Sequence, residues 1–531
     1  MKEEQLRKEL HHGRLVSCHA DRPSDIYAMF LDAVRRAPDA IALVDGDARW
    51  TYTDLARRVA ACAARLTGLG MQAGERLGIL LSNRADYMTL LIAAARLGVI
   101  AVPMNIRQRA PETAYALTDS GAAALIYDDA LEDELPDRAS VPDVRHWLPF
   151  DAEAAIWSAT TPATLSEAPD RSAVGEDDPF CILYTSGTTG CPKGAVLTHL
   201  GLITICIGSQ NHLQLKDGES MILAVPASHV TGIGLVLMLS IRVAGKVVVE
   251  QAFKARPFLE LAQAERMSFA IMVPAMYKLC LMEPDFDTFD LSSWRIGAFG
   301  GAPMAEATID ALAEKAPQMT LVNIYGSTET SSPAVMMPLG QCPTHRDKVG
   351  KPLPYADIVI MDDEGRQLPA GAQGEIWIAG AMTVPRYWNN PEATDRGFAA
   401  GYWKSGDIGV MDKDGYLSVL DRMKDMINRG GFKIYSVEVE NTLMAHEAVA
   451  EAVVVGRPCP VLGERVEAFV VVREQVEQAD LRNYCAARLS DYKVPDHVYV
   501  VEGPLPRNPN GKLLKNVVRE WLAELTEGQA A

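Results

Sequence analysis

Residues 184–194 read YTSGTTGCPKG and directly follow the apolar run FCIL at residues 180–183. Backbone N–H groups of such a Gly-rich turn can converge on one anion, because Gly adopts the necessary backbone angles and carries no Cβ. Hydroxyl groups and one lysine add further donors. We therefore predict a phosphate cradle made of Thr185, Ser186, Gly187, Thr188, Thr189, Gly190 and Lys193. By itself the loop also fits a flexible surface turn, and it is not a Walker A loop, because Pro192 precedes the lysine.

The composition is that of a globular enzyme and argues against several other classes of protein. The chain has 531 residues, of which 48% are apolar and 23% charged, so we expect more than one domain. Its formal charge of −18 disfavours a nucleic-acid partner, because an acidic surface repels phosphate backbones. The nine cysteines include no C-x-x-C pair and no Cys/His cluster at zinc spacing. We therefore expect reduced core thiols in a cytoplasmic protein without a secretory signal.

One apolar stretch has the composition of a membrane segment. Residues 221–241 contain no Asp, Glu, Lys or Arg, which is the pattern that a hydropathy window detects. Pro226, His229, Gly232 and Gly234 interrupt it, however. We expect a short buried strand, a polar loop and a buried helix here, and no membrane span.

Apolar strand-like runs alternate with helix-like segments through most of the chain, as in AIALV at residues 40–44 before TDLARRVAACAARL at residues 53–66. Continuous apolar strands between helices predict sheets that are covered on both faces. From about residue 349 to residue 419, short strands alternate with Gly and Asp turns, as in a small β-barrel. After Asp421 a compact unit of mixed helices and strands begins. The predicted fold class is therefore α/β: a large N-terminal domain of layered α/β subdomains plus a small β-barrel, and a small α+β C-terminal domain.

Seven further motifs follow the loop in chain order. They are VPASHVTG (225–232), GAFGGAP (297–303), YGSTE (325–329), GEIWIAG (374–380), WKSGDIG (403–409), DRMKDMINRGGFKIYSVEVE (421–440) and PRNPNGK (506–512). Together with YTSGTTGCPKG they resemble the adenylate-forming superfamily, which includes acyl-CoA synthetases, peptide-synthetase adenylation domains and firefly luciferase. The resemblance implies an enzyme that uses ATP, Mg²⁺ and coenzyme A. It also implies a large domain at residues 1–420, a hinge at 421–424 and a mobile C-terminal domain at 425–531.

The resemblance assigns nucleotide-binding roles to single residues. Glu329 would bind Mg²⁺, because a hard cation prefers carboxylate oxygen. Tyr325 would stack on the adenine, and Thr328 would donate a hydrogen bond to the α-phosphate. Asp407 would accept the ribose hydroxyls, although alone it fits a turn beside Gly406. The other residues of this set are Gly301, Ala302, Pro303, Gly326, Ser327 and Arg422, and Arg422 alone also fits an ion pair with Asp421 or Asp425.

Four residues near the C-terminus are assigned to catalysis and domain movement in the same way. Lys512 would offset the repulsion between a carboxylate and a triphosphate and stabilise charge at the α-phosphorus. The alternative for Lys512 is a surface lysine, as we expect for Lys515. Gly430 and Gly431 would lie along the path of coenzyme A, or would simply form a tight turn. Lys424 stands at the family's hinge position.

The acid-binding pocket is also inferred from the resemblance. Its expected walls are His229, Val230, Thr231, Gly234, Leu235, Met276, Gly301, Pro333 and Ala334. A lone histidine such as His229 is typical of a satisfied core residue, whereas its family position makes it a pocket wall and a gate toward the thiol tunnel. The walls are apolar and include no Arg that could take a second carboxylate.

These residues predict an AMP-forming acid–CoA ligase. It would form an acyl-adenylate with release of pyrophosphate, and then an acyl-CoA thioester with release of AMP. The predicted substrates are aryl or phenylpropenoic acids such as ferulate or coumarate, and a medium-chain fatty acid is the alternative. A stand-alone enzyme that loads a carrier protein and a non-catalytic nucleotide-binding protein are the other hypotheses. The predicted partner is a small-molecule carboxylic acid, and the predicted assembly is a monomer or a homodimer.

Overall fold

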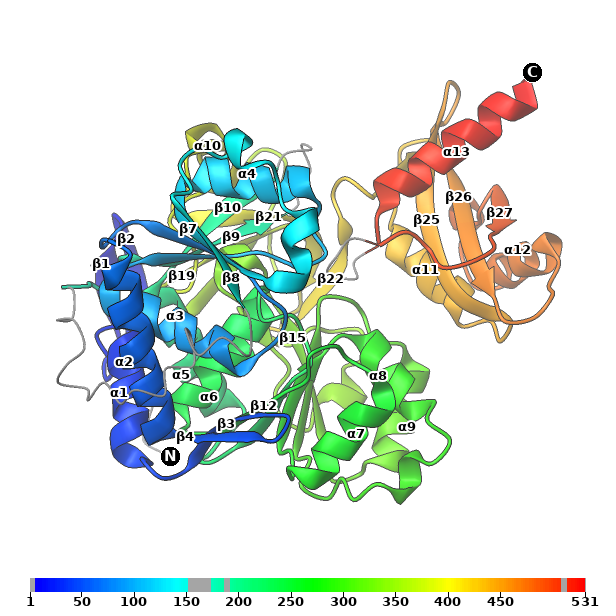
Figure 1. Ribbon diagram of the computed structural model, residues 1–531. Helices are drawn as coiled ribbons and strands as arrows, with labels where there is room; N and C mark the ends of the chain where they lie inside the picture. The colour runs from blue at the N-terminus through cyan, green and yellow to red at the C-terminus, as the bar shows by residue number, and fades with distance from the viewer. Residues whose placement is uncertain (1–4, 151–172, 186–191, 508–512, 531) are drawn as a thin grey trace. The chain divides into compact units, whose positions relative to one another are not determined.

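The computed structural model describes residues 5–150, 173–185, 192–507 and 513–530 (Figure 1). The chain divides into two compact units, of which the first comprises residues 1–358 and 378–403 and the second residues 359–377 and 404–531. The mixed α/β architecture, with a larger N-terminal and a smaller C-terminal part, agrees with the fold class expected from the sequence. The predicted domain bounds at residues 420 and 425 remain a prediction.

A nine-stranded sheet lies in the first unit, with the order β17–β16–β15–β14–β13–β11–β12–β3–β4. The six strands from β15 to β3 are parallel, and β4, β16 and β17 join antiparallel at the edges. The strands are β3 (Ile41–Asp45), β4 (Ala48–Thr51), β11 (Ser220–Leu223), β12 (Lys246–Val249), β13 (Phe269–Met272), β14 (Ile296–Gly300), β15 (Thr320–Tyr325), β16 (Val335–Met336) and β17 (Lys351–Pro352). Figure 1 shows α7 (Ala255–Ala264), α8 (Pro274–Leu281) and α9 (Glu306–Lys315) along one side of this sheet.

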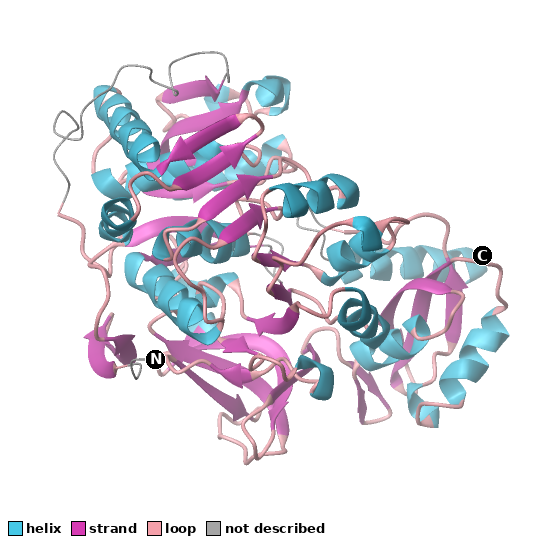
Figure 2. Ribbon diagram, turned by 90° about the horizontal axis from the view of Figure 1, so that it is seen from below, coloured by secondary structure: helices cyan, strands magenta, loops and turns pink. Residues whose placement is uncertain are grey.

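A second sheet of the first unit has six strands in the order β10–β9–β6–β5–β7–β8, and β10 alone is antiparallel to its neighbour. The strands are β5 (Arg76–Leu80), β6 (Ile100–Pro103), β7 (Ala122–Asp128), β8 (His146–Phe150), β9 (Pro179–Thr185) and β10 (Lys193–Thr198). The accompanying helices are α1 (Ile26–Arg36), α2 (Tyr52–Gly68), α3 (Ala85–Leu97), α4 (Ala110–Ser120), α5 (His199–His212) and α6 (Leu239–Arg242). Figure 2 shows that the strands of this unit are layered between helices.

Helix α3 lies between the two sheets, because it contacts β6 of one and β3 of the other. Its sequence is accordingly apolar on all sides and nearly every residue is buried. Helix α2 begins at a capping box in which Thr51 and Asp54 satisfy each other's backbone N–H groups. Ahead of these helices, β1 (Leu6–His11) and β2 (Arg14–His19) form a separate antiparallel hairpin.

Residues 221–241 fold as the sequence predicts, with one difference. Strand β11 is followed by a polar loop and then by a helix. The first part of this helix, η3 (Thr231–Met238), is a π-helix that continues into α6. A Cβ atom at Gly232 would lie 2.3 Å from the carbonyl oxygen of Pro226, so only Gly permits this close approach. Among the helices of the described chain, none combines the length and the apolar composition that crossing a bilayer requires.

The strands that the sequence predicts as a small barrel pair as a sheet in the order β18–β19–β21–β20, with β22 beside β21. They are β18 (Ala356–Met361), β19 (Gln373–Gly380), β20 (Phe398–Ala399), β21 (Tyr402–Met411) and β22 (Leu417–Arg422), and α10 (Pro391–Gly397) precedes β20. The division between the two units falls within β18, β19 and β21.

The second unit contains another five-stranded sheet, in which β24–β23–β26–β25 are neighbours and β27 pairs with β26. Its elements are β23 (Ile427–Arg429), β24 (Phe432–Ile434), α11 (Ser436–Met444), β25 (Val449–Cys459), β26 (Gly463–Val472), α12 (Gln478–Ala486), β27 (His497–Val500) and α13 (Lys515–Ala530). Alternate residues of β26 point to opposite faces. Val466, Ala468 and Val470 pack with α11 and α12, whereas Phe469 packs with α13, so helices cover both faces of the sheet.

Candidate active site at the strand ends

The predicted motifs of the first unit lie at one edge of the nine-stranded sheet. Strands β11, β13, β14 and β15 are parallel neighbours, so their carboxyl ends lie at the same edge. The segments that directly follow them are 224–230, 273–276, 301–303 and 326–329. In open α/β sheets, ligands bind beyond the carboxyl ends of the strands. The fold therefore gathers motifs that are separated by about a hundred residues of sequence.

Glu329 is a buried carboxylate at this edge, in the short helix η5 (Thr328–Thr330) after β15. It is 7% exposed. Its Oε2 accepts a hydrogen bond from Ser327 Oγ at 2.5 Å, and its Oε1 accepts one from Tyr387 Oη at 3.0 Å. In the described part of the chain no Lys, Arg or His forms an ion pair with Glu329. A buried carboxylate that only hydroxyl groups compensate fits a hard divalent cation such as Mg²⁺.

Tyr387 connects Glu329 with the phosphate loop. Its ring lies 5.2 Å from Lys193 Nζ, a cation–π contact, while its hydroxyl donates to Glu329. Trp403 Nε1 in turn donates to Tyr387 Oη at 3.4 Å. Burial, together with the charge of Glu329, raises the pKa of Tyr387, so its hydroxyl stays protonated as a donor. Sequence reasoning missed Tyr387, because no motif or spacing distinguishes it from the other tyrosines.

The phosphate loop is the connection of the β9–β10 hairpin. Thr185 and Lys193 are paired across the two strands, and Thr185 Oγ1 donates to the Lys193 carbonyl at 3.4 Å. The antiparallel pairing brings both ends of the loop together, as a cradle requires. Five predicted donors, Ser186, Gly187, Thr188, Thr189 and Gly190, lie outside the described residues, so their role remains a prediction.

His229 is a neutral histidine next to the π-helix. Burial lowers its pKa to about 4. The Thr231 backbone N–H donates to His229 Nδ1 at 3.3 Å, so Nδ1 is the acceptor and the ring proton is on Nε2. His229 can therefore donate a hydrogen bond from Nε2, but it carries no charge at neutral pH.

The predicted acid-pocket walls meet around the loop that follows Glu329. A Cβ atom at Gly326 would lie 3.0 Å from Pro333 Cα, and Ala334 N donates to the Tyr325 carbonyl at 3.0 Å. A Cβ atom at Gly234 would lie 3.6 Å from the carbonyl oxygen of Ser331, which brings η3 to the same loop. The exposed fractions are 2% for Val230, 1% for Leu235, 9% for Met276 and 0% for Ala334. These four walls are thus buried, whereas His229 and Thr231 are half-buried and Gly301, also a predicted wall, is exposed.

The adenine-side residues after β14 differ from these walls, because they face solvent. Gly301, Ala302 and Pro303 are all exposed. Gly301 has φ +78°, a left-handed conformation that favours Gly and turns the chain sharply away from the strand. The turn leaves these backbone groups open at the edge where Tyr325 ends β15.

Asp407 and Arg422 are brought together within the second unit. They are direct partners of β21 and β22, and Arg422 Nε lies 2.6 Å from Asp407 Oδ1. Asp407 is 4% exposed. The sequence left open a pairing of Arg422 with Asp421 or Asp425, but Asp421 accepts from Ser436 and Asp425 pairs with Arg519. The guanidinium therefore orients the carboxylate that we predict to bind ribose.

Gly430 and Gly431 form the two-residue turn between β23 and β24. Their φ values are +61° and +89°, which such a hairpin turn requires at both positions. The tight-turn alternative is thus confirmed, and the predicted contact with coenzyme A remains a prediction. Lys424 has an exposed side chain, and it lies in a turn in which Asp425 N donates to the Arg422 carbonyl at 3.0 Å.

Lys515 is not the surface lysine that the sequence suggests. Its Nζ lies 2.7 Å from Glu440 Oε1 and donates to Ser436 Oγ at 2.5 Å, and its side chain is 12% exposed. The pair is buried because α13 begins where α11 packs on β25. Lys512 lies outside the described residues, so its catalytic role remains a prediction.

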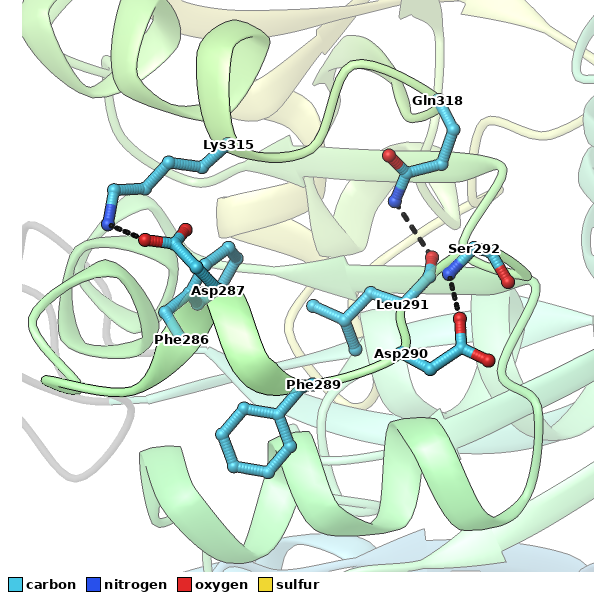
Figure 3. A pocket seen from close by; sticks show the side chains of 8 residues that line it. All are labelled: Phe286, Asp287, Phe289, Asp290, Leu291, Ser292, Lys315 and Gln318. Atoms are coloured by element: carbon cyan, nitrogen blue, oxygen red, sulfur yellow. Dashed lines mark hydrogen bonds and ion pairs between the residues drawn. The ribbon is translucent and has the colours of Figure 1, made fainter.

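A cavity of about 240 Å³ lies away from all these residues, beside α9. Its polar groups bind one another: Lys315 Nζ lies 3.3 Å from Asp287 Oδ2, and Gln318 donates to the Leu291 carbonyl at 2.8 Å (Figure 3). None of its lining residues belongs to a predicted motif. We therefore assign it no part in the site.

Comparisons with known proteins identify the family of this chain. The family model "AMP-binding enzyme" matches residues 30–388, and "AMP-binding enzyme C-terminal domain" matches residues 438–512. The long-chain-fatty-acid–CoA ligase FadD13 of Mycobacterium tuberculosis is 34% identical over 484 residues, which cover 89% of this chain and 93% of that protein. Feruloyl-CoA synthase of Amycolatopsis sp is 33% identical over 487 residues, 91% of this chain and 96% of that protein.

Solved structures are similar as well. That of o-succinylbenzoate CoA synthetase from Bacillus subtilis, in complex with an acyl-adenylate intermediate, has a TM-score of 0.82 at 29% identity. It covers 92% of this chain and 97% of that one. Another structure of that enzyme, in complex with ATP and magnesium ion, has a TM-score of 0.81.

The fold and the strand-end motifs define an adenylate-forming enzyme, and the matches show that this chain belongs to the AMP-binding enzyme family. Within that family it is an AMP-forming acyl-CoA synthetase, an ATP-dependent ligase of carboxylic acids and coenzyme A.

Proposed function

We propose that this ligase activates an aryl or phenylpropenoic acid of the feruloyl or coumaroyl type. The observation that carries the proposal is the wall set of Val230, Leu235, Met276, Pro333 and Ala334, which is apolar and includes no Arg. A second carboxylate on the substrate would be left unpaired among these side chains, which is costly. The similarity to feruloyl-CoA synthase supports the same substrate class.

A fatty acid is the second candidate, because FadD13 is at least as similar to this chain as feruloyl-CoA synthase is. An apolar wall suits an alkyl chain and an aromatic ring equally well. The close packing of Val230, Leu235 and Ala334 favours the ring, because a compact planar acid displaces fewer buried atoms than a long chain does.

The catalytic roles that we propose follow from the charges at the strand ends. Glu329 would bind Mg²⁺, which when bound offsets the charge of the ATP phosphates. Tyr387 keeps the Glu329 carboxylate in place, and Lys193 adds a positive charge beside it. Thr328, which directly precedes Glu329, would donate a hydrogen bond from its hydroxyl group to the α-phosphate. Lys512 would stabilise the charge that develops as the carboxylate attacks.

The test of the substrate is a panel of acids assayed for pyrophosphate release, with and without coenzyme A. The panel contains ferulate, coumarate, benzoate, octanoate and palmitate, and nucleotides are separated after the reaction. We expect AMP and pyrophosphate with the first two acids, and acyl-CoA when coenzyme A is added. A clear preference for octanoate or palmitate would replace the aryl proposal by the fatty-acid candidate.

The role of Mg²⁺ is tested with Glu329→Gln, which keeps the shape of the side chain and removes its charge. We expect pyrophosphate release to fall by about 10²–10³-fold at low Mg²⁺ concentration. The matched control is Glu375→Gln, a carboxylate of β19 that accepts from the Gly406 backbone N–H. Equal losses in both variants would contradict the metal-binding role of Glu329.

We also propose a reducing, cytoplasmic compartment. Among the described residues all eight cysteines are free, and seven of them are buried. Buried thiols without disulfide partners are typical of proteins from such compartments.

A further inference from the structure

The N-terminal hairpin β1–β2 turns inward a face that carries both polar residues and the apolar Val16. The register pairs Arg7 with Cys18, Glu9 with Val16 and His11 with Arg14, so Glu9, His11 and Cys18 share one face of the hairpin. His11 and Cys18 are buried on this face, whereas Leu10 and Leu15 on the other face are 71% and 67% exposed. Strands with one solvated face usually have the opposite pattern. Polar groups turned inward must find partners there.

The ligand-type atoms of this face converge. One atom each of Glu9, His11 and Cys18 lie within 4.8 Å of one another. His11 Nε2 is 3.5 Å from Glu9 Oε2 and 3.8 Å from Glu176 Oε1. The His11 side chain is 8% exposed, and Nε2 has no hydrogen-bond partner among the described residues. Its other ring nitrogen, Nδ1, bonds to Asp177 Oδ1 at 2.9 Å.

We propose that Glu9, His11, Cys18 and Glu176 bind one divalent cation of the zinc type. Zinc bonds of about 2.0–2.3 Å place the atoms of a tetrahedral site about 3.3–3.8 Å apart, close to the spacing found around His11 Nε2. One nitrogen, one sulfur and two carboxylate oxygens are ligand types that zinc accepts. A ligating histidine commonly donates its second ring N–H to a carboxylate, which is the role that Asp177 has here.

The contacts of Arg22 support a different interpretation of the cluster, namely an ion-pair network without a metal. Its guanidinium lies 2.7 Å from both Glu9 Oε2 and Glu176 Oε2. The network alone leaves His11 Nε2 without a hydrogen-bond partner among the described residues, its distance to Glu9 Oε2 being 3.5 Å. Besides Arg22, the charge of Arg14 also interacts with Asp177. The exposed Arg7 adds a further contact to Glu9 at 2.5 Å. Arg22 donates through Nη2 to Glu9 and Glu176, and so fixes both carboxylates beside His11.

The ion would have a structural role, because four protein ligands leave no open position for substrate. Glu176 and Asp177 directly precede β9, and β9 leads into the phosphate loop at Thr185. A bound ion would thus tie the N-terminal hairpin to the strand that positions this loop. Binding would replace the Cys18 thiol proton, which would be released to solvent.

Cobalt(II) added to the metal-free full-length chain is the direct test. Coordination by Cys18 gives a thiolate-to-cobalt charge-transfer absorption, and four-coordination gives intense ligand-field bands. We expect both signals to saturate at one equivalent and to disappear when Zn²⁺ is added. A folded wild-type chain that gives neither signal would overturn the proposal and leave the ion-pair network only.

Matched variants locate the site. His11→Gln and Cys18→Ala should abolish the cobalt signal, and Asp177→Asn should weaken binding about 10–100-fold. His345→Gln and Cys459→Ser are the controls, because His345 contacts Thr344 and Gln341 rather than the hairpin, and Cys459 is the one described cysteine that is not buried. Both controls should bind cobalt like the wild type. If His11→Gln or Cys18→Ala keeps the signal, or Cys459→Ser loses it, the assignment is wrong. Circular dichroism establishes that each variant is folded.

Discussion

His229, a predicted wall of the acid pocket, shows how burial sets the protonation state of a single residue. Its pKa falls to about 4 because the ring is removed from solvent, and the Thr231 N–H binds Nδ1. The ring is therefore uncharged at neutral pH. A neutral Nε2–H donor can orient a carboxylate by a hydrogen bond. A fully charged ring would attract the carboxylate more strongly and slow its release.

The depressed pKa predicts a defined dependence of stability on pH. The unfolded chain protonates His229 near pH 6.5, whereas the folded chain does so near pH 4. Between these values the unfolded state binds more protons, so this residue lowers the stability of the fold as the pH falls from 6.5 to 4. Because the side chain is only half-buried, the full effect is at most about 3 kcal/mol. His229→Asn should remove it, and urea unfolding at pH 7 and pH 5 measures the difference. An identical loss in wild type and variant would contradict the burial of this ring.

We predict opposite roles for Lys512 and Lys515, although they are three residues apart: Lys515 pairs with Glu440, and Lys512 is expected to be catalytic. Lys515→Ala leaves Glu440 buried and unpaired, so we expect a loss of about 3 kcal/mol in the free energy of unfolding. Lys512→Ala should leave stability unchanged and lower acyl-adenylate formation by orders of magnitude. Thioester formation from supplied acyl-adenylate should largely survive in Lys512→Ala. Pyrophosphate release and urea unfolding of both variants test the pair, and equal effects on both half-reactions in Lys512→Ala would indicate a structural lysine.

At the scale of elements, turns and strand ends place the reactive groups. The parallel strands β11, β13, β14 and β15 align their carboxyl ends, so four distant segments meet at one edge. The antiparallel β9–β10 pair instead brings the two ends of the phosphate loop together. In the second unit, the β23–β24 turn holds the two glycines that we predict to lie along the coenzyme A path. Both have conformations that other residues rarely adopt.

The predicted role of the glycine turn in thioester formation can be tested separately from the loss of stability that any side chain at a positive φ causes. Gly431→Ala places a Cβ at φ +89°, which should cost about 1 kcal/mol. Gly503→Ala is the matched control, because φ there is +86° and no atom lies within 4 Å of the new Cβ in either case. We expect equal losses of stability, but a selective loss of thioester formation in Gly431→Ala. If both variants form thioester at the same rate, the turn has no part in the coenzyme A path.

At the scale of the whole molecule, two half-reactions require different groups of the C-terminal part. Lys512 is predicted to act with the phosphates, and Gly430 and Gly431 are predicted to lie along the coenzyme A path. We infer that one fixed arrangement does not serve both, so the C-terminal part must move. Lys424 is the predicted hinge, and in this structure it is the second central residue of a turn from Arg422 to Asp425.

Proline at this position tests the hinge. Pro fixes φ and is disfavoured at the second central position of the common type I turn, so Lys424→Pro restricts the conformations of this segment. We expect acyl-adenylate formation to be largely kept and thioester formation to be lost. Lys424→Ala, which removes only an exposed side chain, should keep both activities. A folded Lys424→Pro variant with both rates intact would place the hinge elsewhere.

Much of the fold and part of the site could be predicted from the sequence. Alternation of apolar strands with helices is a local pattern, and it predicted the layered α/β architecture. Local rules also predicted the strand, loop and helix of residues 221–241, but not that the helix begins as a π-helix. The close approach of Gly232 to Pro226 was likewise visible only in the structure.

By itself the sequence determined the class of enzyme, because eight motifs in chain order resemble one superfamily, although a single residue such as Asp407 also fits a structural role when taken alone. Only the tertiary structure decided which side chains meet. Tyr387 donates to Glu329, which is 58 residues away in the chain. Arg422 pairs with Asp407 and not with Asp421 or Asp425. Lys515 is buried against Glu440. The hairpin cluster of His11 and Glu176 arises in the same way. Such pairs depend on strand register and helix packing, which are properties of the folded chain as a whole and leave no fixed spacing in the sequence.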